Sequence, residues 1–143
     1  PMNAPSPAAP TPTALDAIIA EGVPLVSGWG AQVLAAADGA ATVRLPYRAD
    51  LLRPGNTVSG PAIMGLADVA MWAALLSLTG GRDESVTSTM TVNFLRQAGP
   101  NPVIAEARII KRGRRAIFGE VIIRAEGSDD ICTHVTTTWT VIV

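Results

Sequence analysis

The segment that decides the fold is TVSGPAIMGLADVAMWAALL, residues 57–76. Ser59 can cap a helix through its hydroxyl, and Pro61 suits the first turn because its missing N–H would have no intrahelical partner there. Residues 62–78 are then apolar on every side, and two glycines at 80–81 end the pattern. Such a helix must be surrounded by protein, so we expect it at the centre of the fold.

The residues before this segment predict a short helix and a hairpin. Residues 13–22 offer a cap, apolar residues at helical spacing and a stopping glycine. Residues 26–37 and 41–47 have an extended pattern on either side of an Asp-Gly turn. Residues 48–58 have no sustained period, and we expect a loop there.

The second half of the chain is almost entirely strand in character. Its segments are rich in β-branched residues and separated by Gly, Pro or Asp, and the lack of helices between them favours antiparallel pairing. We expect strands at residues 85–95, 102–111, 116–126 and 131–143. The pattern predicts an α+β fold, with an antiparallel sheet of about six strands wrapped around one long helix. Ile, Val, Met and Ala should also occupy much of the sheet's other face, which oligomerisation would cover.

Composition limits the kind of molecule. With 143 residues, 48% of them hydrophobic, the chain suits one domain at residues 13–143, after a disordered leader at residues 1–12. A net charge of −1 argues against nucleic-acid binding. Cys132 is the only cysteine, and no Cys/His spacing suits a metal, which favours a reducing, cytoplasmic setting. The apolar helix is slightly short for a membrane span and contains Asp68, so we expect it to be buried in a soluble core and not in a membrane.

Asp68 is the most unusual residue, since every nearby position of the helix is apolar or glycine. Burying an unpaired carboxylate is costly. None of the neighbours three and four positions away can form an ion pair with it; these are Met64, Gly65, Met71 and Trp72. Asp68 is therefore either a structural acid bonded to backbone amides or a functional group facing a cavity.

Three other features have competing interpretations. Gly60 opens the helix, where exposed amides and the helix dipole favour an oxyanion, although a plain loop-to-helix junction gives the same pattern. His134 is the only histidine, and without a Ser or Cys nucleophile motif we expect a packed or surface residue. Large aromatics are usually core, and only Trp72, one turn after Asp68, is a candidate for lining a pocket beside that carboxylate.

Two segments together resemble hotdog-fold thioesterases of the phenylacetate-degradation (PaaI-like) type. They are residues 57–70, with Ser-Gly-Pro and Leu-Ala-Asp, and VTSTMTVNFLR at residues 86–96. That family typically shows His-Gly-Gly, an apolar helix with Leu-Ala-Asp, and a strand ending in Asn-Phe-Leu-Arg. The similarity runs from about residue 25 to the carboxyl end and includes the basic hairpin at 111–115. It implies a hotdog fold that works as a homodimer or homotetramer.

The resemblance also implies roles for individual residues. Asp68 would act as general base or nucleophile on a small or medium, or aromatic, acyl-CoA thioester, while the Gly60 amide polarises the carbonyl. Thr87 would hold a water for the Asp68 of a neighbouring subunit, so the active site would lie at a subunit interface. No metal and no cofactor beyond the coenzyme A of the substrate are expected. Further substrate contacts would come from Ser59, Met64, Trp72, Arg96, Arg112 and Arg114.

The basic hairpin has two interpretations, a site for coenzyme A phosphates or an ordinary solvated turn. The chain also departs from the family pattern. Ser59-Gly60-Pro61 replaces His-Gly-Gly, so the histidine and one amide donor are lost. Arg53 stands where the family often has asparagine, and Asn56 follows three residues later.

The alternative to an enzyme is a non-catalytic acyl-CoA-binding module. Asp68 favours the enzyme, because a binder of an uncharged acyl chain has little use for a carboxylate in an apolar helix. A dehydratase of the same fold would carry a catalytic histidine on this helix, and the helix has none.

Overall fold

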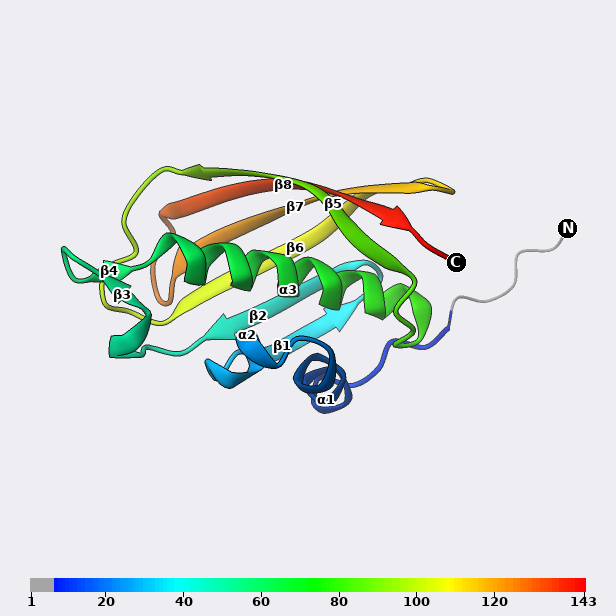
Figure 1. The fold of residues 1–143 in the computed structure, drawn as a ribbon, viewed down its shortest axis with the longest axis horizontal. Coiled ribbons are helices and arrows are strands. Elements are labelled where there is room, and N and C mark those ends of the chain that lie inside the picture. The colour runs from blue at the N-terminus through cyan, green and yellow to red at the C-terminus, as the bar shows by residue number, and fades with distance from the viewer. Residues whose placement is uncertain (1–6) are drawn as a thin grey trace, which may run out of the picture.

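The structure, a computed structural model, describes residues 7–143. A six-stranded antiparallel sheet in the order β1-β2-β6-β7-β8-β5 curves around the long helix α3, Gly60–Thr79 (Figure 1). Its strands are β1 (Gln32–Ala37), β2 (Ala40–Leu45), β5 (Ser85–Phe94), β6 (Val103–Arg112), β7 (Ala116–Ala125) and β8 (Ile131–Val141). The predicted α+β fold is confirmed, and each predicted strand of the second half lies within two residues of its observed bounds.

Helix α3 forms the core of this arrangement. The Ser59 hydroxyl accepts a hydrogen bond from the Ala62 amide at 3.4 Å, and Gly80 ends the helix in the left-handed conformation at a φ of 66°. By length and composition alone α3 could cross a bilayer, but 78% of its most apolar window is buried inside this fold. The burial comes from the sheet and the N-terminal helices, as expected for a helix apolar on every side.

Two helices precede the sheet. Helix α1, Pro12–Gly22, begins one residue earlier than predicted because Thr11 caps it and Pro12 takes the first helical position. Helix α2, Pro24–Gly28, corrects the prediction of a strand from residue 26. Pro24 opens this helix and Val26 points into the core, so an apolar run that is too short to show a period was misassigned. The strand begins only at Gln32.

The expected disordered leader falls partly outside the described residues, which begin at Pro7. Pro10 lies close to the C-terminal end of α3, since a Cβ built on Gly81 would be 3.2 Å from its ring. Thr11 already belongs to the cap of α1. Helix α1 and its cap therefore begin before the predicted domain boundary at residue 13, and Pro10 already packs close to the end of α3.

The expected loop at 48–58 contains short elements that fix the start of α3. A 3-10 turn, Ala49–Leu51, leads into the two-residue strands β3 (Leu52–Arg53) and β4 (Thr57–Val58). The Ser59 amide donates to the Leu51 carbonyl at 2.9 Å. The residue before Gly60 is thus held by the backbone, which gives the helix a fixed origin.

The sheet's outer face carries apolar and polar side chains together. Ile104, Phe118 and Ile122 are in register with the outward residues Arg44, Thr138 and His134. This face also carries threonines and ion pairs. Two of these join neighbouring strands, Arg108–Glu120 at 2.7 Å and Arg124–Glu106 at 2.6 Å, and Arg44 pairs with Glu126 in the turn after β7 at 2.7 Å. His134 also lies here, 2.9 Å from Glu120, as expected for a surface histidine. The alternation of the strands sends most of their apolar residues inward onto α3, and the remaining apolar residues share the outer face with charged and polar ones.

Gly119 provides a test of how closely the sheet packs on α3. An added Cβ there would contact the Met71 side chain and lie 2.8 Å from the Arg108 carbonyl oxygen. Because backbone cannot move aside as a side chain can, Gly119→Ala should reduce the free energy of unfolding by about 1–3 kcal/mol. Urea unfolding measures the change. Gly28→Ala is the control, since its Cβ would meet no atom within 4 Å; equal midpoints for the two variants would contradict the close packing.

Candidate active site

Asp68 and Thr87 form the polar centre of the inner face. Thr87, near the start of β5, donates a hydrogen bond from Oγ1 to Asp68 Oδ1 at 2.6 Å. The two residues belong to one chain, which corrects the expectation that Thr87 serves the Asp68 of a neighbouring subunit. Among the described residues, Thr87 is the only side chain that donates a hydrogen bond to this carboxylate.

A β-bulge aims Thr87 at the helix. Thr87 pairs with Trp139 of β8 and Thr89 pairs with Thr138, so Ser88 is an extra residue without a partner. Trp139 is buried on the inner face, which places Thr87 on that face as well. Without the extra residue, the alternation from Thr89 would turn residue 87 outward. The bulge is therefore what brings the hydroxyl to Asp68.

The environment of Asp68 favours its neutral form. Burial beside apolar residues raises the pKa of the carboxyl above its ordinary value, and the Thr87 hydrogen bond partly offsets this by stabilising the anion. In the described chain no Lys or Arg forms an ion pair with it. A carboxylate with a raised pKa is a stronger base than an ordinary aspartate, which suits proton transfer near neutral pH.

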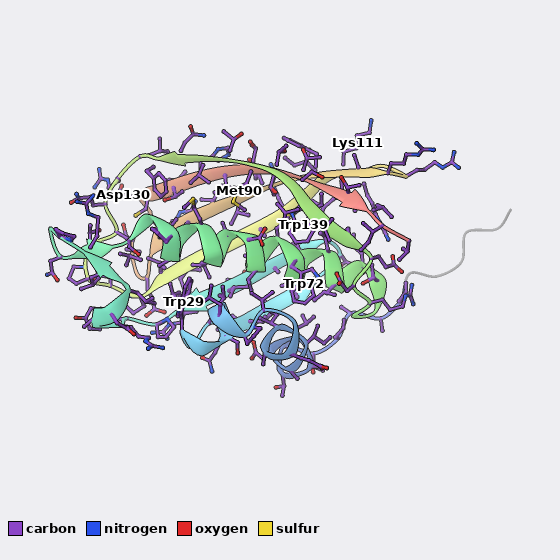
Figure 2. The ribbon with its side chains drawn as sticks, in the orientation of Figure 1. Trp29, Trp72, Met90, Lys111, Asp130 and Trp139 are labelled. Atoms are coloured by element: carbon purple, nitrogen blue, oxygen red, sulfur yellow. The ribbon has the colours of Figure 1, made fainter. Side chains whose placement is uncertain are left out.

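Asp68 opens onto a cavity of about 290 Å³. Its apolar walls come from the end of α1 with the residue that follows it, from α3, and from the strands β5 and β8. The lining residues are Gly22, Val23, Val69, Trp72, Val86 and Trp139. Figure 2 shows Trp72 and Trp139 on the same half of the molecule, toward the C-terminal end of α3. Asp83 and Ser85 are the other polar residues, and no Lys, Arg or His lines this cavity.

Gly60 is the only free amide of the first turn of α3 in the described structure. Pro61 has no N–H, the Ala62 amide donates to the Ser59 hydroxyl, and the Ile63 amide donates to the Ser59 carbonyl at 3.1 Å. No protein acceptor is recorded for the Gly60 N–H among residues 7–143. It points from the positive end of the helix dipole, where an oxyanion would be stabilised.

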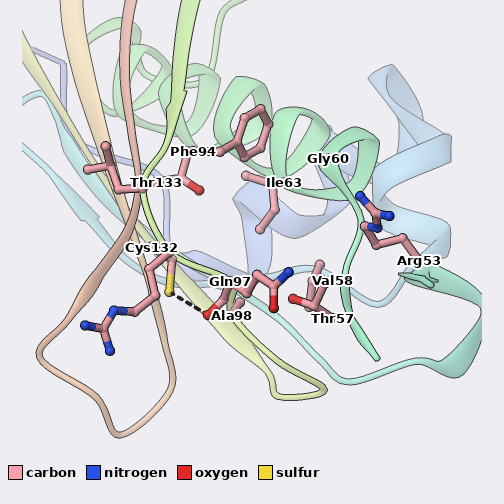
Figure 3. Close-up of a pocket in the computed structure, with 12 residues that line it drawn as sticks. Arg53, Thr57, Val58, Gly60, Ile63, Phe94, Gln97, Ala98, Cys132 and Thr133 are labelled. Atoms are coloured by element: carbon pink, nitrogen blue, oxygen red, sulfur yellow. Dashed lines mark hydrogen bonds between the residues drawn. The ribbon is translucent and has the colours of Figure 1, made fainter. Parts of the chain in front are cut away.

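The Gly60 amide lies in a second cavity, of about 490 Å³ (Figure 3). Phe94 at the end of β5 forms one wall, since a Cβ on Gly60 would be 3.6 Å from its ring. Arg53 lines this cavity and not the one at the Asp68 of the same chain. Arg96 lines it too and forms an exposed ion pair with Asp130 at 3.0 Å.

Gly60 and Asp68 of one chain cannot act on the same carbonyl group. They are eight residues apart on α3, a rise of about 12 Å along the axis. A hydrogen bond to the carbonyl oxygen and contact with its carbon each require about 3 Å. Each chain therefore supplies two separate halves of the predicted constellation.

The remaining predicted site residues have different surroundings. Ser59 is a helix cap, and Met64 is exposed and lines neither cavity. Arg112 and Arg114 line a third cavity, of about 240 Å³, at the basic hairpin. Ser85 lines both this cavity and the one at Asp68, so the hairpin is close to the carboxylate end of the site.

Sequence reasoning missed most of the residues that line the cavity at Asp68 and predicted only Trp72 and Thr87. Gly22, Val23, Asp83 and Trp139 come from other elements, and nothing in their local pattern signals a shared cavity. Trp139 was expected in the core, and its indole N–H is indeed buried without a partner in the described chain. No cluster of three or more His, Cys, Asp or Glu residues suited to a metal ion occurs within residues 7–143.

Comparison with known proteins identifies the family. The model of the Thioesterase superfamily matches residues 55–132. A structure from Silicibacter sp. TM1040 named "putative thioesterase" is 31% identical, covers 92% of each chain and has a TM-score of 0.82. A variant of the phenylacetic acid degradation protein PaaI from Thermus thermophilus is 27% identical, covers 83% of this chain and 99% of its own, and has a TM-score of 0.73.

A conserved protein from Pseudomonas aeruginosa, PA5202, is 31% identical with a TM-score of 0.74, and the match covers 81% of this chain and 91% of that one. The match of the family model spans more than half of the chain, and it includes both Gly60 and Asp68. The chain therefore belongs to the Thioesterase superfamily, as a PaaI-like member with the hotdog fold.

Proposed function

We propose that the protein hydrolyses a small or medium acyl-CoA thioester to the free acid and coenzyme A. The observation that carries this proposal is the Asp68 carboxylate, held by Thr87 in a cavity with otherwise mainly apolar walls. A carboxylate in an apolar helix lowers the stability of the fold, because the charged form is poorly solvated there. Carboxyl groups with a raised pKa in a cavity are concentrated at functional sites. Membership of the Thioesterase superfamily gives the reaction class.

The complete active site is formed by two copies of the chain. Strand β5 is an edge of the sheet, with β8 on one side and no described strand on the other. Val86 and Phe94 on this edge are 45% and 55% exposed, which is unusual for large apolar residues on an unpaired strand. Antiparallel pairing of β5 with the β5 of a second copy would cover both and join the two sheets.

This pairing would bring the two halves of the site together. Asp68 accepts a hydrogen bond from Thr87 near one end of β5, and Gly60 lies beside Phe94 at the other end. In a two-fold pair about the centre of β5, the Phe94 end of one strand faces the Thr87 end of its partner. The Gly60 amide of one subunit would then approach the Asp68 of the other, and each dimer would hold two equivalent sites.

In the reaction, Asp68 takes a proton from a water while the water oxygen bonds to the thioester carbon. Thr87 occupies Oδ1, which leaves Oδ2 for the proton. The negative charge that develops on the carbonyl oxygen is held by the Gly60 amide of the other subunit. When the tetrahedral intermediate collapses, the C–S bond breaks and Asp68 returns the proton to the departing coenzyme A sulfur. The reaction needs no metal or further cofactor.

The substrate's two parts would bind to different surfaces. The basic hairpin, with exposed Lys111 and Arg115 beside Arg112 and Arg114, would take the coenzyme A phosphates; Figure 2 shows Lys111 projecting from one end of the sheet. The acyl group would enter the cavity at Asp68, whose volume is at the low end for ligand sites. No described Lys, Arg or His lines this cavity beside the Asp68 and Asp83 carboxylates, so charge repulsion would disfavour acyl groups that carry a free carboxylate.

Asp68→Asn tests the function directly. Loss of the base should lower kcat/KM by about 10²–10⁴-fold for every acyl-CoA that the wild type hydrolyses, measured by free-thiol release across short, medium, long and aromatic acyl groups. The variant should also melt at a higher temperature at pH 7. Folding raises the pKa of the Asp68 carboxyl, so its ionisation destabilises the folded wild type as pH rises above the ordinary value of 3.8. The higher melting temperature of Asp68→Asn should therefore disappear below about pH 4, where the carboxyl is protonated in both states.

The stability measurement controls for misfolding, since a variant that is inactive and more stable has lost chemistry and not structure. Undiminished turnover in Asp68→Asn would contradict the proposed mechanism. Binding of acyl-CoA without turnover of any substrate by folded wild-type dimer would instead favour the acyl-CoA-binding module.

Thr87→Val tests the hydrogen bond to the carboxylate. The bond lowers the pKa of Asp68, so its removal should move the acid limb of the kcat/KM profile to higher pH. The maximal rate should fall roughly 10- to 100-fold, in line with a lost hydrogen bond to a charged group. Thr87→Ser keeps the hydroxyl and should retain the wild-type profile. An acid limb at the same pH in all three proteins would refute the contact.

Mixing two inactive variants tests the shared site. Asp68→Asn disables one half. Gly60→Pro disables the other, because proline is tolerated at the first helical position but has no N–H for the carbonyl oxygen. In a mixed dimer one site carries both changes while the other carries neither. After unfolding and refolding together in equal amounts, about a quarter of wild-type activity should return, since half of the dimers are mixed and each has one intact site. Two variants that stay inactive when mixed, but form dimers, would place the whole site in one subunit.

A further inference from the structure

The wall of the Asp68 cavity formed by α1 contains a close contact that depends on glycine. Gly22 is the last residue of α1, and both it and Trp72 line the cavity. A Cβ built on Gly22 would lie 2.6 Å from Cη2 and 3.2 Å from Cζ3 of the Trp72 ring. Real Cβ atoms essentially never approach another atom this closely. The six-membered part of the indole therefore occupies the space that any other residue at position 22 would need.

The opposite edge of the same indole is also held. Trp72 Nε1 donates a hydrogen bond to Asp83 Oδ1 at 3.2 Å, and only 8% of the residue is exposed. Trp72 follows Asp68 by one helical turn on the same side of α3. The ring is thus fixed between the polar loop before β5 and the end of α1, directly beside the catalytic carboxylate.

A side chain at position 22 would push the Trp72 ring away from α1. The ring could move mainly into the cavity, because the protein around α3 is otherwise closely packed. The position of the Trp72 ring therefore decides how much of the cavity's volume of about 290 Å³ remains for a ligand. A single methyl group at position 22 would reduce that space without touching Asp68 or Thr87.

We propose that Gly22 sets the upper size limit of the acyl group, by letting the Trp72 ring lie against α1 and away from the thioester. The pair selects uncharged straight-chain or aryl acyl groups by length, and Asp83 keeps the indole in place. This inference rests on the proposed thioesterase function, whose site it describes in more detail.

The test is a double-mutant cycle measured with acetyl-, butyryl-, hexanoyl-, octanoyl- and benzoyl-CoA. Gly22→Ala should lower kcat/KM for the largest accepted group about 10-fold or more relative to acetyl-CoA, since one methylene in an apolar pocket is worth about 10- to 200-fold. Trp72→Phe lacks the ring atoms that the new Cβ would meet, and should extend the range to larger groups. In the Trp72→Phe background, Gly22→Ala should change the ratio by less than about threefold.

Gly28→Ala is the matched control, because it adds a methyl group to the neighbouring helix in open space and outside the cavity. An unchanged size profile in Gly22→Ala, or an equal drop in the single and double variants, would overturn the proposal. If Gly22→Ala does not fold, Trp72→Phe decides alone: a size limit that stays where it was would count against the proposal.

A second readout separates this inference from the function on which it rests. Calorimetry with non-hydrolysable thioether analogues of the same acyl-CoAs measures the size limit without turnover. Wild type that hydrolyses none of the thioesters, while Gly22→Ala weakens binding of only the larger analogues, would reject the proposed function and keep the size limit. Equal affinities of wild type and Gly22→Ala for every analogue would reject the size limit, whatever the turnover.

Discussion

The fold and the site both depend on one constraint, the placement of a carboxylate inside a helix that must be buried. The apolar residues of α3 require protein around the helix, and the curved sheet and the two N-terminal helices provide it. Asp68 instead requires a hydrogen-bond donor or solvent, because an unpaired carboxylate in that apolar environment destabilises the fold. The Ser88 bulge meets this requirement at one point only, by turning the Thr87 hydroxyl inward. The Thr87 hydrogen bond only partly offsets the effect of burial, so the pKa of Asp68 stays raised, as the proposed role of a base requires.

The sequence was informative wherever a single element carries the signal. The apolar run between Ser59 and Gly80 predicted α3 within two residues, and β-branched alternation predicted the second-half strands. Asp68 stood out because one charged residue in an apolar helix violates the local rule, and such violations concentrate at functional sites. Thr87 came only from the family resemblance, because a bulge is defined by the register of two strands and leaves no mark in either one alone.

The sequence did not predict one very short element or the features that depend on several elements. Helix α2 is five residues long, too short for a period, and Pro24 marks either a helix start or an extended segment. The mixture of apolar and charged residues on the outer face was missed because composition does not say which residues face inward. The pairing of Arg124 with Glu106 on the neighbouring strand is seen only in the folded chain. The Gly22 contact joins residues 50 positions apart in the sequence, so only the folded chain shows why glycine is there.

The change from the family's His-Gly-Gly to Ser-Gly-Pro has a physical consequence for catalysis. The hydroxyl of Ser59 is engaged with the Ala62 amide and Pro61 has no N–H, so the first turn offers the Gly60 amide alone to a developing oxyanion. A single donor must then be well oriented, and the backbone bond from Ser59 to Leu51 at 2.9 Å supplies that orientation. The helix dipole adds its positive end at the same point. In the proposed mechanism the start of α3 therefore matters as much as Asp68 itself, and the two would act together only when a second subunit brings them to one carbonyl group.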